Sequence, residues 1–425
     1  MKYILIFVIF LLGVALTQAQ EKTVKDSIEY SILLKRLEII ENKFLLQEKE
    51  DELKKLLEDA EQLTSRKAEE KIDITKKFQS GERQQQGLNP NFSVLGDYFG
   101  AISTKNNKLN QEPSNFTHGY NGIYMRSLEL SMVASLDPFA RGKAFLDISN
   151  KGLSIEEAYM EIINLPLNMS FKAGVFFPEY GLLNRYHTHA LPQFNRPQVC
   201  VNYFGLDGFN GMGLALDFLL PKLLFSDASS LDLSLVKGKH NNSFMSESPG
   251  NLLYVGHIKN FYNLSDASYL EYTLSAIGGK NNDDTGDFSL IGSFGIHYKW
   301  QPPSKAKYKS SDWRAELYYG SRETPLGTER SKGFYAMCHN KVNARLWLGG
   351  RIGYSELPYD ADQYEWDYTV NIDFWQSEFV FFRLQYQYNN RGIYNIMNEP
   401  VNYPSDHAVI LQVSWAMGPH KHEAY

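Results

Sequence analysis

Residues 364–390 read YEWDYTVNIDFWQSEFVFFRLQYQYNN, and this stretch decides the fold. From Tyr364 to Phe374 every second side chain is aromatic or aliphatic, and the positions between, Glu365 to Asp373, are polar. Residues 380–390 repeat this alternation after a short turn. Because successive side chains of a strand point to opposite faces, each arm predicts a two-faced β-strand. Arms of roughly ten residues exceed the usual five or six and suit a transmembrane barrel as well as a soluble sheet.

The composition narrows the class of protein. The 425 residues carry 43 basic and 49 acidic side chains, a net charge of −6, which lacks the positive excess of nucleic-acid-binding proteins. Aromatic residues make up 14%, which favours strands and interfacial girdles. A mean hydropathy of −0.37 argues against a helical membrane protein but not against a barrel with a polar lumen. We expect Cys200 and Cys338 to be free thiols, because two cysteines make no disulfide framework.

The N-terminus predicts export. Lys2 precedes an apolar run from Tyr3 to Leu16, and Thr17-Gln18-Ala19 forms a small-x-small cleavage site, so residues 1–19 are predicted to be a signal peptide. The alternative is a membrane anchor, but the apolar run is shorter than the roughly 20 residues that a helical span needs.

Residues 20–87 differ from the rest of the chain. They are rich in Lys and Glu, and apolar residues recur at 3-4 spacing from Tyr30 to Phe44 and again from Leu53 to Leu63, out of phase. This pattern predicts a periplasmic helical segment with short coiled-coil seams, which would permit assembly as a homotrimer. A single amphipathic helix folded against another surface is the alternative, because three or four sustained heptads are missing.

Strand patterns fill residues 88–425, with roughly 16 candidates. The expected strands are Asn91–Ser103, Tyr120–Leu136, Phe139–Ser149, Leu153–Asn164, Met169–Phe177, Asp207–Leu219, Ser229–Lys237, Leu252–Asn260, Ser268–Gly278, Asp287–Trp300, Asp312–Arg322, Gly333–His339, Ala344–Glu356, Tyr364–Trp375, Glu378–Asn390 and Asp406–Gly418. Short turns alternate with mostly longer polar connections, which is typical of an outer-membrane barrel. We therefore predict an all-β, antiparallel transmembrane barrel, because lipid offers no partner to an open strand edge.

Several motifs carry a resemblance to a known family. They are Leu88–Val94, Ser154–Glu161, Leu165-Pro166, Phe171–Gly174, Pro178–Pro197 and Phe204–Phe209. These residues resemble a family of porin-like barrels of the Gram-negative outer membrane, often labelled zinc-regulated outer-membrane receptors and distantly related to phosphate-selective porins. The resemblance spans most of the mature chain and is most specific from Glu156 to Gly208. It implies a passive or semi-selective pore in outer-membrane lipid. The segment before Asn89 is too short and too helical to be the plug of a TonB-dependent receptor.

The long connection from Phe177 to Leu206 lies where porins often fold a loop into the barrel. We expect it to narrow the channel and set its charge preference, because charges at a constriction tune ion selectivity. An external loop packed on the rim is the alternative. The residues predicted to line the pore or its constriction are Arg141, Lys143, Glu157, Glu161, Arg185, His187, His189, Arg196, Arg314, Arg345, Arg351, Arg383 and Gln385. Their mixed signs leave the solute and the charge selectivity open, and a merely solvated lumen wall would look the same.

Other chemistry is weakly indicated. His187 and His189, or His420 and His422, can each point the same way from an extended segment, but two ligands are too few for zinc, so no metal site is predicted. Neither a Gly-rich phosphate loop nor a G-x-S-x-G elbow occurs, and we expect no enzyme and no cofactor. A barrel hydrolase stays an alternative, because a triad need not be close in sequence.

The predicted function is diffusion of small solutes or ions through the lumen. Two alternatives remain, an envelope barrel that acts only as a structural or adhesive anchor, and an exported soluble β protein. Gly418-Pro419 interrupts the alternation before Tyr425, which leaves the register of the closing strand open.

Overall fold

The computed structural model describes residues 91–104, 121–149, 152–237, 243–244, 250–282, 284–392 and 405–418. The expected signal peptide, the helical segment and the tail after Gly418 lie outside these residues. Within the described ranges, no helix combines the length and the apolar character needed to cross a membrane.

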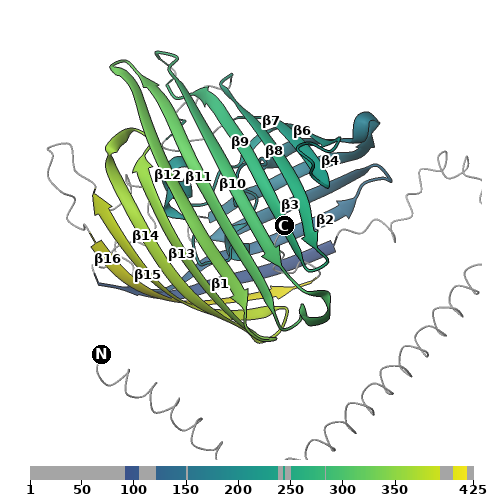
Figure 1. Ribbon diagram of the computed structural model, residues 1–425, viewed down its shortest axis with the longest axis vertical. Helices are drawn as coiled ribbons and strands as arrows, with labels where there is room; N and C mark the ends of the chain where they lie inside the picture. Colours follow the sequence, from purple (N-terminus) through teal and green to yellow (C-terminus); the bar gives the residue numbers. More distant parts are fainter. Residues whose placement is uncertain are drawn as a thin grey trace, which may run out of the picture. The chain divides into compact units, whose positions relative to one another are not determined.

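The described residues form sixteen antiparallel strands closed into a barrel (Figure 1). Each strand pairs with its neighbours in sequence, and β1 pairs with β16. The first eight are β1 (Asn91–Ser103), β2 (Gly122–Ser135), β3 (Ala140–Ser149), β4 (Gly152–Leu165), β5 (Met169–Phe176), β6 (Gly211–Leu220), β7 (Ala228–Lys237) and β8 (Leu252–Ser265). The others are β9 (Ser268–Lys280), β10 (Phe288–Trp300), β11 (Ser310–Thr324), β12 (Gly327–Lys341), β13 (Leu346–Leu357), β14 (Asp360–Trp375), β15 (Val380–Gly392) and β16 (Ser405–Met417). The predicted sixteen-strand barrel is confirmed.

The hairpin β14–β15 has the two faces that its sequence predicts. Ile372 pairs with Leu384, and Asp373 pairs with Arg383. Leu384 is 48% exposed on the outer face, whereas its neighbour Gln385 is 0% exposed on the inner face. The apolar positions therefore face outward and the polar positions face the lumen.

Closure of the barrel depends on the last strand. β16 pairs with β15 on one side and with β1 on the other, from Val94 opposite Met417 to Ser103 opposite Ala408. Gly418 then takes a φ of +98°, and a Cβ there would lie 2.4 Å from the backbone oxygen of Phe92. The interruption seen in the sequence thus ends β16 without disturbing its register.

The connections differ between the two rims as predicted only in part, because the rim of short turns also carries the longer connections 221–227 and 301–309. Short turns at residues 136–139, 342–345 and 376–379 share one rim, and residues 177–210 join β5 to β6 at the other. That second rim also has two-residue turns. One joins β11, which ends at Thr324, to β12, which begins at Gly327. The expected strand began only at Gly333. Residues 327–330 are exposed and polar on both faces, so they show no alternation to predict a strand.

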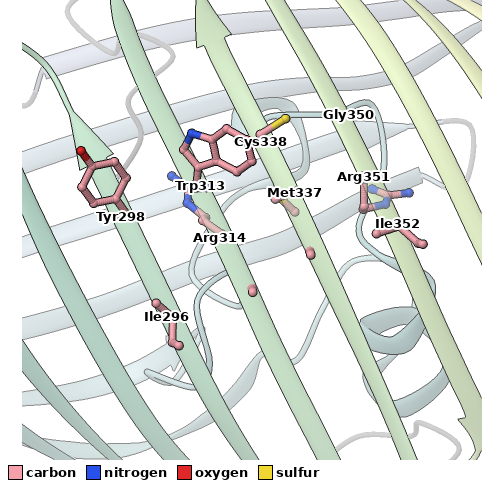
Figure 2. A pocket seen from close by; sticks show the side chains of 11 residues that line it. Ile296, Tyr298, Trp313, Arg314, Met337, Cys338, Gly350, Arg351 and Ile352 are labelled. Carbon is pink, nitrogen blue, oxygen red and sulfur yellow. The ribbon is translucent and has the colours of Figure 1, made fainter.

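The outer face carries a shallow apolar hollow of about 390 Å³ over β10–β13 (Figure 2). Ile296, Trp313 and Ile352 surround it, and small side chains such as Ala315 and Ala336 form its floor. It lies on the opposite side of the sheet from the lumen. The hollow therefore arises where small outward residues leave a gap between large ones, and it plays no part in the site described next.

Candidate functional site

Residues 177–210, here called the inner segment, lie inside the barrel. They contain η4 (Thr188–Ala190) and α4 (Gln198–Phe204). Their hydrogen bonds to lumen-facing side chains join Gly181 N to Ser275 Oγ (2.9 Å), Leu182 N to Glu316 Oε2 (3.2 Å), Phe194 N to Gln385 Oε1 (2.9 Å), Gln198 N to Asp367 Oδ1 (3.2 Å), Asn202 Nδ2 to Ser355 Oγ (3.1 Å) and Tyr203 OH to Ser331 Oγ (2.7 Å). Because these partners lie on β9 and on β11–β15, the rim-packed alternative is wrong.

One side of the lumen is filled with apolar side chains. Leu183, Val199 and Tyr203 of the inner segment pack in one buried cluster with wall residues that include Ile277 of β9 and Ile291 of β10. A wall strand with water in the lumen would carry polar residues on its inner face. Ile277 and Ile291, single buried apolar residues on otherwise mostly polar inner faces, are therefore the sequence signal for a segment inside the barrel, and the alternation argument did not use it.

Arg196 holds the inner segment together rather than lining a passage. Its buried guanidinium donates to the backbone oxygens of Leu183 (2.6 Å), Tyr186 and Asp207 (3.2 Å). Gly208, with a φ of +83°, lies so close that a Cβ would be 2.8 Å from the guanidinium carbon. The predicted contact of Arg196 with the channel is thus corrected.

Arginines on β11–β15 are paired with carboxylates on the inner face. The ion pairs join Arg314 to Asp312 (3.1 Å), Arg351 to Asp367 (2.6 Å) and Arg383 to Asp373 (2.8 Å). Arg351 also donates to the backbone oxygen of Asn195 (2.8 Å), and Gln385 accepts from the backbone N–H of Phe194. These wall residues therefore position the inner segment.

Arg345 is the second correction. The expected strand began at Ala344, which would have directed Arg345 to the lumen. The strand begins instead at Leu346, and Arg345 lies exposed in the turn between β12 and β13. Asn343 Oδ1 accepts the backbone N–H groups of Arg345 and Leu346 at 2.9 Å each. A capped turn occupies the place of the expected first residues of the strand.

Exposed positive charge gathers where the inner segment approaches β3. Arg141 is 46% exposed and pairs with Glu161 at 2.6 Å. Arg185 is 31% exposed and pairs with Glu179. Lys143 lies 5.8 Å from the ring of Tyr159 and within electrostatic range of both arginines. The structure thus brings together three of the predicted basic residues that sequence alone could not connect.

The pKa of Glu179 reflects the basic side chains around it. Burial alone would raise the pKa of its carboxyl. The positive charge of Arg185, followed by that of Lys259, outweighs burial and lowers the pKa of Glu179 to about 2. Glu179 therefore stays ionised at neutral pH and fixes Arg185 at the surface of the inner segment.

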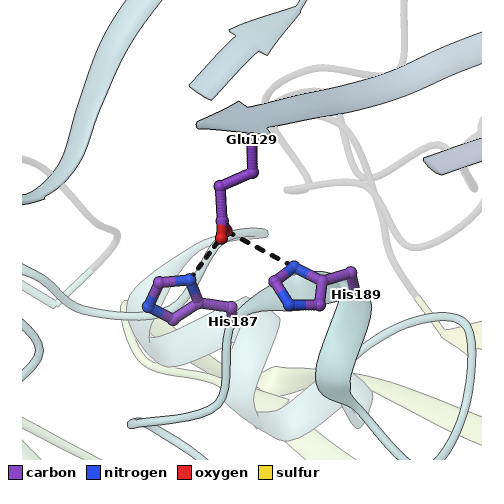
Figure 3. Close-up of side chains that lie close together, drawn as sticks. All are labelled: Glu129, His187 and His189. Carbon is purple, nitrogen blue, oxygen red and sulfur yellow. Dashed lines mark hydrogen bonds and ion pairs between the residues drawn. The ribbon is translucent and has the colours of Figure 1, made fainter. Parts of the chain in front are cut away.

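His187 and His189 meet Glu129 of β2 in a buried cluster (Figure 3). His187 Nδ1 lies 2.9 Å and His189 Nδ1 lies 3.4 Å from Glu129 Oε2. Glu157 of β4 approaches His187 Nε2 at 3.1 Å. Burial lowers the pKa of His187, but the surrounding glutamates raise it well above its ordinary value. Both histidines and Glu157 were predicted to line the constriction, and the structure instead buries them between the inner segment and the wall. Glu129 was missed, because one acid on a distant strand carries no local motif.

Comparison with known proteins places the fold. No protein-family model matches the chain. An uncharacterised protein of Aquifex aeolicus (strain VF5) is 25% identical over 396 residues, covering 81% of each chain. Among solved structures, the outer-membrane channel DcaP of Acinetobacter baumannii matches with a TM-score of 0.52 and 13% identity over 79% of this chain and 99% of its own. An anion-selective porin from Comamonas acidovorans matches with a TM-score of 0.51 and 9% identity over 78% of this chain and all (100%) of its own. The chain thus has the fold of outer-membrane porins.

Proposed function

We propose that this protein is an outer-membrane porin whose lumen, narrowed by the inner segment, passes small solutes or ions. The observation that carries the proposal is the position of residues 177–210, hydrogen-bonded to the inner face of a closed barrel with an apolar outer face. A closed barrel pairs the backbone N–H and C=O groups of every strand, as lipid requires, and a segment inside it restricts which solutes can pass.

The route of passage follows from the packing. The buried cluster around the inner segment includes wall residues from β4 to β12, whereas Arg141 and Arg185 stay partly accessible on the side of β3. We infer that solutes pass along this basic side. Exposed positive charge at a constriction favours anions. The proposed passage therefore prefers small anions weakly, because Glu161 and Glu179 partly neutralise its charge.

The rest of the chain enters the proposal through its sequence pattern alone. Residues 1–19 would be removed on export, and residues 20–87 would form a periplasmic coiled coil that joins copies, for example as a homotrimer. Cross-linking of the mature protein and of a variant that begins at residue 88 tests this part. Equal yields of cross-linked trimer from both would contradict a role for the coiled coil.

Single-channel recording in planar bilayers tests the pore. We expect a measurable conductance for the intact protein and a larger one after deletion of Asn184–Asn195, which removes the middle of the inner segment. A deletion of similar length in the connection between β15 and β16 is the matched control and should leave conductance nearly unchanged. All three proteins must first show a heat-modifiable band, which reports a folded barrel.

The outcomes separate the candidates. Unchanged conductance after the Asn184–Asn195 deletion would contradict narrowing by the inner segment. A folded intact protein that passes no current would favour the anchor. A reversal potential under a salt gradient then gives the charge preference of any current.

A further inference from the structure

Three side chains of the types that bind transition metals converge on one buried point. Glu129 belongs to β2, and His187 and His189 flank Thr188 at the start of η4. One ligand atom from each lies within 4.8 Å of the others. The two histidines alone would be too few for a metal ion, and the wall of the barrel supplies the third ligand that the sequence did not reveal.

The distances suit a tetrahedral ion. Zinc bonds of about 2.0–2.1 Å to nitrogen and oxygen imply about 3.4 Å between neighbouring ligand atoms of a tetrahedron. Glu129 Oε2 lies 2.9 Å from His187 Nδ1 and 3.4 Å from His189 Nδ1. Glu156 Oε2 lies 3.5 Å from His187 Nδ1, beside this group of three but not part of it. Small side-chain adjustments would thus surround one ion.

A second, independent feature is the environment of His187 on its other side. A histidine that binds metal through one nitrogen usually donates its other N–H to a carboxylate. Glu157 Oε2 lies 3.1 Å from His187 Nε2, and Glu157 Oε1 accepts the backbone N–H of Phe177 at 3.1 Å. Phe145 packs edge-on against the His187 ring at 4.7 Å between centroids. The imidazole is therefore held with Nδ1 aimed at Glu129.

The charges favour a cation in the same place. Glu129, Glu156 and Glu157 surround two imidazoles, and buried carboxylates need compensating positive charge. A doubly protonated His187 offers one such charge and is the alternative to a metal. Imidazole nitrogen with carboxylate oxygen is a ligand set that selects zinc and its transition-metal neighbours over magnesium or calcium.

We propose that Glu129, His187 and His189 form a binding site for a divalent transition metal of the zinc class, which fastens the inner segment to the barrel wall at β2. Such an ion would link residues 58 positions apart in the chain. Its consequence for conduction rests on the proposed porin function, but its binding does not.

Zinc binding by the full-length chain in detergent tests the site. Protein stripped with a chelator is dialysed against Zn²⁺, and metal per chain is counted by mass spectrometry. Because the chain has other histidines, including His420 and His422, the decisive comparison is with the double variant His187→Gln/His189→Gln. We expect the intact chain to hold one zinc more than this variant, and Glu129→Gln to lose the same ion. Co²⁺ in place of Zn²⁺ should give the intense visible absorption of a tetrahedral site only in the intact chain.

The control is His257→Gln. His257 is also a buried, lumen-facing histidine, but its Nδ1 contacts Ser275 Oγ at 2.8 Å, and it lies outside the cluster. This variant should bind zinc like the intact chain, and Glu157→Gln should bind it about 10–100-fold more weakly. If heat modifiability shows that every variant is folded, equal zinc content in the intact chain and the double variant would refute the proposed metal site.

Proteolysis tests the fastening separately. Zn²⁺ should slow cleavage within the inner segment of the intact chain and should have no effect on the double variant. Bound zinc without protection would overturn the fastening. A protein that passes no current but binds zinc as expected would refute the pore and leave the metal site standing.

Discussion

The hairpin β14–β15 and the inner segment occupy the same barrel but are specified in different ways. In the hairpin, each residue is placed by the alternation of its own strand and by a partner opposite, as Ile372 is by Leu384. In the inner segment, placement depends on bonds to residues far along the chain. Phe194 bonds to a side chain 191 positions away, and Gln198 to one 169 positions away.

If the proposed function holds, this difference separates the residues that assemble the barrel from those that control passage of solutes. The wall needs its outer apolar face and its paired backbone, and a change there acts on insertion and closure. The inner segment needs its buried arginine, its histidine cluster and the polar wall residues that receive it. A change there should leave the barrel intact and alter only what the lumen admits.

A charge on the outer face of the hairpin should have the largest effect. Leu384→Arg places a guanidinium among apolar side chains that face lipid, which costs about 2–4 kcal/mol near the middle of the membrane. We expect assembly in lipid vesicles to fall severely, measured as the heat-modifiable fraction on semi-native gels.

The neighbouring inward residue is the matched control. Gln385→Glu keeps the shape of the side chain and an oxygen for the Phe194 N–H, so we expect normal assembly with altered conductance. If Leu384→Arg and Gln385→Glu assemble equally well, the two faces of the hairpin have been assigned wrongly.

Loss of Arg196 should loosen the inner segment without affecting the wall. Arg196→Met leaves the buried backbone oxygens of Leu183 and Tyr186, and the partly buried one of Asp207, without their charged donor, and buried bonds of this kind contribute about 1.5–3 kcal/mol each. We expect protease to cut within residues 177–210 much faster, while the heat-modifiable band persists. Arg345→Met changes an exposed turn arginine and should leave both measurements unchanged. Slow cleavage of the Arg196 variant would show that other contacts suffice to hold the segment.

Much of the wall could be predicted from the sequence, because its rule is local. The outward positions of Tyr368, Val370 and Leu384 follow from a period of two. The rule fails at strand ends, for example where β12 leaves the apolar band at Gly327–Arg330, since both faces then meet water and the alternation disappears. Export, the coiled coil and trimer assembly stay predictions.

The sequence predicted most residues of the candidate site but not how they are arranged. The four residues Arg185, His187, His189 and Arg196 were assigned to the constriction as a group, yet the fold leaves Arg185 partly exposed and buries the other three. Glu129 and Glu157 reach His187 from two strands that only the closed barrel brings beside the inner segment. A local pattern holds no information on such encounters. The apolar Ile277 on the otherwise mostly polar inner face of β9 was the available hint.

Acid should weaken the hold of the inner segment modestly. The pKa of Glu179 is about 2 in the folded protein and about 4.5 for an ordinary glutamate, so its ion pair with Arg185 contributes stability above about pH 4.5. That contribution is lost as the pH falls from about 4.5 to 2, and partial exposure limits it to about 1 kcal/mol. We expect current fluctuations to increase over this range.

Glu179→Gln identifies the source of the effect. The current through this variant should fluctuate more than that through the intact protein at pH 6, and the difference should shrink as the pH falls toward 2, because Glu179 of the intact protein then becomes protonated. An equal response of both proteins at every pH would assign the acid sensitivity to other groups.

The smallest expected effect concerns the charge of the passage itself. Arg141→Gln removes a half-exposed positive charge beside the inner segment but leaves the outer face and the buried arginines unchanged. Because the pair with Glu161 is partly screened by water, we expect little change in stability and a shift of the reversal potential by a few millivolts toward cation preference. Glu161→Gln removes the partner and should shift the potential in the opposite direction. At high salt, the reversal potentials of both variants should approach that of the intact protein, because the salt screens a single charge. If both substitutions shift the potential the same way, or neither does, solutes do not pass beside β3, and the inner segment directs them elsewhere in the lumen.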